Sequence, residues 1–139
     1  MQYDGYAKIP DFAWDSIARI RTEIFEFLTK IPQNNYVLTN NLYEYDGDRN
    51  LYEQVKKMAE KRGSLFVPAR ILINQDEHLK RVINPNRRER WKSIDPQDVY
   101  NEVPLLSIVH PHLLELDVSN LSPEKAAKEI ANHIKSLTS

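Results

Sequence analysis

The 139-residue sequence contains no cysteine, which excludes disulfides, thiolate catalysis and cysteine-ligated zinc. It contains only three glycines, Gly5, Gly47 and Gly63. Neither phosphate-binding pattern, G-x-x-x-x-G-K-S/T or G-x-G-x-x-G, can be written from those positions. The sequence therefore holds no glycine-rich phosphate loop.

A strong net charge and long apolar runs are also lacking. The formal net charge is −1, so bulk electrostatics favour neither nucleic acid nor a membrane surface. No apolar run approaches the roughly 18 residues of a membrane span, and the N-terminus has no basic-then-apolar signal pattern. We therefore predict a cytoplasmic protein without membrane or nucleic-acid partners. Its length and 41% hydrophobic content predict a single domain, residues 1–139.

Positive charge is concentrated in one segment, Leu79–Pro96, which stands out against this neutral background. From Lys80 to Lys92 the segment holds six basic residues and one acid, Glu89. Prolines bracket the cluster, which favours a short helix or a loop. One interpretation is a flap that grips phosphate through arginine forks, and the other is a solvated basic surface helix. The basic residues are Lys80, Arg81, Arg87, Arg88, Arg90 and Lys92.

Hydrophobic periodicity predicts helices that alternate with short strands. Residues 1–11 show no clear periodicity, Asp46-Gly47-Asp48 is typical of a turn, and Pro68 implies an edge, a bulge or a strand end. The predicted strands are Tyr36–Thr39, Ser64–Ile73 and Leu113–Val118. The first three predicted helices are about Phe12–Lys30, Arg49–Lys61 and Gln75–Ile83, with Asp11 as a possible N-cap of the first and Gly63 as the stop of the second. A helical turn is predicted at Gln97–Asn101. The last helix has Ser122 as its N-cap and Pro123 at its first position.

This alternation predicts an α/β fold with three layers, in which helices flank a small, mostly parallel sheet. Ligands bind at the carboxyl ends of such strands, where Thr39 and Asn40 lie, although asparagines there also suit a turn. Arg21 contacts either solvent or a ligand. The pair His110 and His112 lacks further obvious ligands, so we predict no metal site.

Four segments together resemble the later part of the P-loop small-molecule kinases, namely YVLTNNL, LYEQVKKMAEKRGSLFVPARIL, LKRVINPNRRERWKSIDP and LLELDVSNLSPEKAAKEI. They are most similar to the shikimate-kinase-like and chloramphenicol-phosphotransferase-like group. No single motif is diagnostic, and the resemblance rests on order and spacing from Asp11 to Leu137. It implies ATP and Mg²⁺ as cofactors and a small hydroxylated molecule as phosphoryl acceptor.

The resemblance also implies roles for individual residues. Arginines of the basic segment would close over the transferred phosphoryl group as a lid, and one of them would lie against the adenine. The loop after the last strand would border the base. The implied sites are Arg81, Arg87, Arg88 and Arg90 for phosphate, Arg81, Ser119, Asn120 and Pro123 for the base, and Arg21, Thr39 and Asn40 for the substrate.

The sequence departs from this family at its start, because the first strand, the phosphate loop and the following helix are absent. We therefore expect a kinase-like chain that does not transfer phosphate by itself. In the family the first strand lies between those matched by Tyr36–Thr39 and Ser64–Ile73, so its absence would expose their backbone groups. The chain would then be part of a longer polypeptide, a short form that pairs these strands directly, or a subunit whose sheet another copy completes. The alternative function is a non-catalytic module that binds an anion or a partner.

Overall fold

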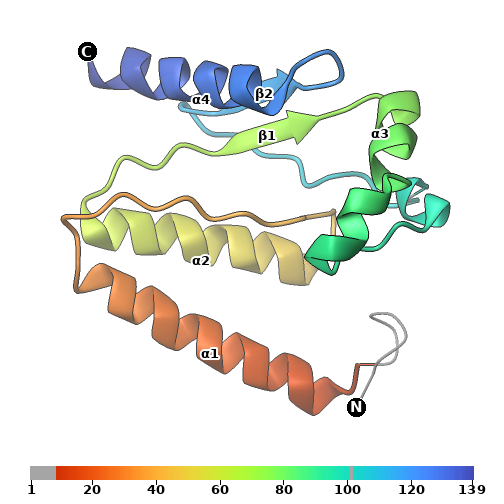
Figure 1. Cartoon of the computed structure of the whole chain (residues 1–139). Helices are drawn as coiled ribbons and strands as arrows, with labels where there is room; N and C mark the ends of the chain where they lie inside the picture. The colour runs from red at the N-terminus through yellow and green to blue at the C-terminus, as the bar shows by residue number, and fades with distance from the viewer. Residues whose placement is uncertain (1–8, 101) are drawn as a thin grey trace. The chain divides into compact units, whose positions relative to one another are not determined.

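The computed structural model describes residues 9–100 and 102–139 (Figure 1). The irregular start predicted for residues 1–11 is therefore described only from Ile9, and Asn101 of the predicted turn Gln97–Asn101 lies outside the described residues. The chain divides into two compact units. Unit 1 comprises Met1–Asn40 and Arg49–Phe66, and unit 2 comprises Asn41–Asp48 and Val67–Ser139.

Unit 1 contains helix α1, Asp11–Thr29, and most of helix α2, Asp46–Arg62. The N-cap of α1 is Pro10, which makes no side-chain capping bond, so the prediction of Asp11 as N-cap is wrong by one residue. Asp11 instead occupies the first turn, where the positive end of the helix dipole stabilises its carboxylate.

Helix α2 begins earlier than predicted, because Asp46-Gly47-Asp48 forms its first turn rather than a separate turn. Both aspartates suit that position, since acids are stabilised at a helix N-terminus. The helix ends at Arg62, and Gly63 follows with φ of 67°. The predicted stop at Gly63 is confirmed.

The predicted strand Tyr36–Thr39 is wrong, because this segment belongs to no sheet. It runs as a stretched chain alongside α2 (Figure 1). An apolar run makes a strand only when another strand supplies partners for its backbone groups, and no described residue does so here.

Unit 2 contains a two-stranded parallel sheet of β1, Ala69–Leu72, and β2, Leu114–Asp117. Ala69 pairs with Leu114, and Leu72 pairs with Asp117. The predicted strand Ser64–Ile73 is shortened because the ladder starts only after Pro68, which has no N–H to donate. Of the three alternatives predicted for Pro68, an edge, a bulge or a strand end, the structure shows the strand end.

Helices flank this small sheet, so the predicted combination of helices with a small parallel sheet is confirmed in that coarser form. Helix α3 spans Gln75–Val82, and helix α4 spans Pro123–Thr138 and contacts β2. Ser122 caps α4 as predicted, because its Oγ accepts a hydrogen bond from the Lys125 N–H. Two 3₁₀ helices, η2 at Pro85–Arg90 and η3 at Pro96–Val99, lie between α3 and β2.

Candidate functional site

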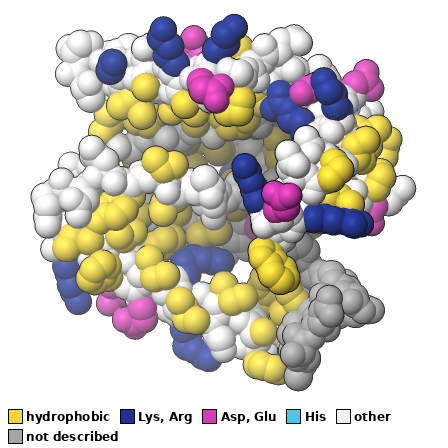
Figure 2. Space-filling view, viewed as in Figure 1, with side chains coloured by type: hydrophobic (Ala, Val, Ile, Leu, Met, Phe, Trp, Pro, Cys, Tyr) yellow, Lys and Arg dark blue, Asp and Glu magenta, His cyan; other side chains and the backbone are white. Residues whose placement is uncertain are grey.

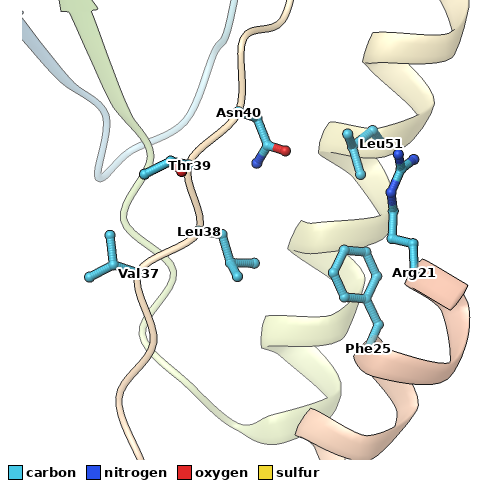
Figure 3. A pocket seen from close by; sticks show the side chains of 7 residues that line it. All are labelled: Arg21, Phe25, Val37, Leu38, Thr39, Asn40 and Leu51. Carbon is cyan, nitrogen blue, oxygen red and sulfur yellow. The ribbon is translucent and has the colours of Figure 1, made fainter. Parts of the chain in front are cut away.

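Unit 1 holds a pocket of about 330 Å³ (Figure 3). Helix α1 contributes Arg21 and Phe25, and α2 contributes Leu51. The remaining lining comes from the stretched segment Val37–Asn40. The structure thus brings together all three residues, Arg21, Thr39 and Asn40, that the sequence predicts at a substrate site.

Side chains alternate along the stretched segment (Figure 3). Leu38 and Asn40 point toward Leu51 and Arg21, whereas Val37 and Thr39 point to the other side of the chain. This alternation is what an extended backbone produces. Asn40 therefore faces the guanidinium side of the pocket, and Thr39 borders it from the opposite side of the segment.

Arg21 supplies the pocket with a positive charge that no described residue neutralises through an ion pair. It is half-buried, and within the described part of the chain it forms neither an ion pair nor a hydrogen bond. A guanidinium offers five donors in a planar fork, which matches a carboxylate or a phosphate. Phe25, Leu38 and Leu51 add an apolar wall beside it.

Arg62, which the sequence places only at the predicted helix stop, holds the stretched segment in place. Its Nη2 donates to the main-chain oxygens of Ile31 at 3.2 Å and Asn34 at 2.7 Å. Its guanidinium also lies 4.7 Å from the centre of the Tyr36 ring, within cation–π range. The end of α2 thereby positions the segment that lines the pocket.

In unit 2, Arg81 is engaged by the protein. Its Nε donates to Glu77 Oε1 at 2.8 Å, and its Nη2 donates to the Val118 oxygen at 2.9 Å. The same nitrogen reaches the Leu121 oxygen at 3.5 Å. The Arg81 hydrogen bond, together with the nearby charges of Lys80 and Arg81, holds the pKa of Glu77 below its usual value. The structure thus brings Arg81 to the loop that the resemblance assigns to the base.

That loop is also fixed by Ser119, which is buried. Its Oγ accepts from the Asn74 N–H at 2.8 Å and donates to Asp117 Oδ1. The Ser119 hydroxyl and then its N–H lower the pKa of the Asp117 carboxyl. The Ser119 side chain therefore has structural partners, whereas Asn120 is exposed in the loop and Pro123 is the exposed first residue of α4.

The three arginines of η2 divide into one tethered and two unattached side chains. Arg87 Nε donates to the Ser93 oxygen at 2.9 Å, so it closes the turn of its own segment. Arg88 and Arg90 are exposed and have no partner among the described residues. Trp91 follows them with φ of 55° and 98% of its surface exposed. Such a backbone conformation is unusual for a bulky residue.

The rings of His110 and His112 lie 5.1 Å apart, and His133 Nε2 donates to the His112 oxygen at 2.9 Å. Across residues 9–100 and 102–139, no group of three or more histidines or acids is placed to hold a metal ion. Within the same ranges, no helix has both the length and the apolarity needed to cross a membrane.

No protein-family model, curated protein or solved structure matches this chain.

Proposed function

We propose that this chain is related to the ATP-dependent kinases of small hydroxylated molecules and that it binds such a molecule in the unit 1 pocket. The observation that carries the proposal is the convergence of Arg21 and Asn40 on one cavity with an apolar wall. A volume of about 330 Å³ is at the small end of the range for ligand pockets.

The chemistry of the lining residues indicates the ligand class. The Arg21 guanidinium would bind a carboxylate or a phosphate, and the Asn40 amide both donates and accepts hydrogen bonds, as a hydroxyl requires. Phe25 and Leu51 would contact the carbon skeleton. A small hydroxylated carboxylate satisfies all three contacts at once.

Phosphoryl transfer is not part of the function proposed for this chain alone. The sequence holds no glycine-rich loop to cradle ATP phosphates and place Mg²⁺. The resemblance still assigns base contacts to Arg81, Ser119, Asn120 and Pro123, and these remain predictions. We expect no tight, magnesium-dependent binding of ATP by these 139 residues.

Calorimetric titration with shikimate and gluconate tests the pocket. We expect binding that weakens about 10- to 100-fold in Arg21→Met, because hydrogen bonds to a charged group contribute about 1.5–3 kcal/mol. Arg19→Met is the matched control, since Arg19 lies on an exposed part of α1 and donates to Ser16. Equal binding by both variants, or no binding of any hydroxylated carboxylate, would remove the support for this function.

A second candidate function, binding of an anionic partner, is favoured by Arg88 and Arg90. Both cations are exposed and lack partners among the described residues, and they precede Trp91, which is almost fully solvent-accessible. Pyrophosphate titration of Arg88→Gln/Arg90→Gln tests this. Salt-sensitive pyrophosphate binding that the double variant loses would support this function. Binding that the substitutions leave unchanged would show that Arg88 and Arg90 do not form the anion-binding site.

A further inference from the structure

The stretched segment Asn35–Asn40 has the backbone of a strand but none of a strand's partners. In the described part of the chain, no main-chain N–H or C=O of these residues takes part in a hydrogen bond. Residues of β1, by contrast, pair with β2 along their whole length. An extended backbone with unpaired groups is a template for another strand.

The side chains of this segment alternate as in a strand, and the Val37 side is the more accessible one. Leu38 and Asn40 point toward the pocket, whereas Val37 points away from it and is 90% exposed. Arg62 fixes the start of the segment through the Asn34 oxygen and the Tyr36 ring. The backbone is therefore held in place with its hydrogen-bonding groups available.

The segment also lacks the features that normally protect an exposed edge. Natural edge strands carry charged side chains, prolines or bulges that block further pairing. From Gln33 to Tyr43 the sequence contains neither a charged residue nor a proline. An uncharged edge opposes no like charges when it meets its own copy, so it is electrostatically compatible with itself.

We propose that Asn35–Asn40 is a dimerisation edge at which a second copy adds the same segment as an antiparallel β-strand. A two-fold axis perpendicular to the new ladder makes the two strands antiparallel and the interface isologous. Centring the axis on Val37 places this residue opposite its own copy and Tyr36 opposite Leu38 of the second copy. In both pairings the two opposed side chains point to the same face of the new ladder, as the pleat of a sheet requires.

The apolar contact in this arrangement comes from Val37, whose exposed side chain would meet its counterpart at a Cβ separation of about 4.5–5.5 Å. Six residues span only about 20 Å, so the contact is smaller than a standard interface. The dimer is therefore expected to be weak and to depend on protein concentration. This inference does not rest on the proposed ligand of the pocket.

Cross-linking through an introduced cysteine tests the proposal. No other thiol can form a competing disulfide, because this sequence has no cysteine. Val37→Cys is compared with Val109→Cys, whose parent side chain is 96% exposed in unit 2. With diamide as the oxidant of the two thiols, we expect Val37→Cys to form a disulfide-linked dimer at least about tenfold faster, because pairing raises the local thiol concentration. Equal rates for the two variants would overturn the proposal.

Sedimentation velocity over a concentration series gives an independent reading. We expect the wild-type sedimentation coefficient to rise with concentration and that of Val37→Lys to stay constant, because two lysines would oppose each other at the axis. Val37 is exposed, so circular dichroism should show an unchanged fold. A wild type that stays monomeric, or a dimer that Val37→Lys leaves intact, would refute this pairing.

Discussion

Arg81 donates a hydrogen bond to the main-chain oxygen of Val118, so the end of α3 is tied to the turn that follows β2. The same side chain is paired with Glu77 one helical turn earlier. One arginine thus links its own helix to the far end of the parallel strand pair.

Replacing Arg81 with methionine should destabilise the protein, because the Val118 oxygen loses its donor and Glu77 loses its partner. We expect the free energy of unfolding to fall by about 1–2 kcal/mol. This loss is smaller than for a fully buried arginine, because 39% of the Arg81 side chain is exposed to solvent. Urea unfolding measures it. Arg88→Met is the control and should stay within about 0.5 kcal/mol of wild type, since Arg88 is exposed. Equal effects of the two substitutions would contradict this account.

Ser119→Ala should cost about 0.5–1.5 kcal/mol, because the Asn74 N–H loses its part-buried hydrogen bond to the buried Ser119 hydroxyl. The cost should also depend on pH. The folded state lowers the pKa of Asp117 through Ser119, so this contribution is present above the ordinary aspartate pKa and disappears as pH falls through the lowered value.

The difference in unfolding free energy between wild type and Ser119→Ala is therefore expected to narrow between pH 7 and about pH 3. Ser136→Ala serves as control, because Ser136 Oγ is exposed on α4 and bonds only within its own helix. Its small effect should not change with pH. A Ser119→Ala effect that is constant from neutral to acid pH would show that the Asp117 contact adds nothing.

Two glycine substitutions in or next to α2 should change the free energy of unfolding in opposite directions. Gly63 has φ of 67°, so Gly63→Ala is expected to cost about 1–2 kcal/mol in backbone strain. A Cβ at either glycine would meet no atom within 4 Å, so steric contact plays no part. Gly47→Ala lies in the first helical turn and should stabilise by up to about 0.5 kcal/mol. Thermal unfolding compares the two, and a stabilising Gly63→Ala would contradict the assigned backbone geometry.

Tyr52→Phe should be neutral or stabilising by about 1 kcal/mol. The Tyr52 hydroxyl is buried without a hydrogen-bond partner among the described residues, and burial is the main cause that raises the pKa of this group. Tyr45→Phe, at an exposed tyrosine, is the control and should change little. Chemical unfolding at pH 7 measures both variants. A clear loss of stability in Tyr52→Phe would reveal a partner for the hydroxyl.

The sequence predicted the elements whose limits depend on local chemistry. Ser122 with Pro123 marks a helix start, Gly63 marks a helix stop and Pro68 limits a strand, and each effect arises from the residue's own side chain or ring. The strand Tyr36–Thr39 was not predictable in the same way, because an apolar run says nothing about whether a neighbouring strand exists.

The substrate-site residues were predicted from the resemblance and from their place at the end of an expected strand. The structure brings Arg21, Thr39 and Asn40 to one pocket even though that strand is unpaired. Arg62 was missed because its contacts to main-chain oxygens depend on the fold and leave no pattern in the sequence.

Binding in the unit 1 pocket is tested most directly by a ¹⁵N-resolved NMR titration of the whole chain with shikimate and gluconate. We expect saturable shifts at the amides of Val37–Asn40 and at the Arg21 side chain, and we expect Arg21→Met to lose them. Shifts confined to Arg88 and Arg90, or no shifts up to millimolar ligand, would contradict a binding site in the unit 1 pocket.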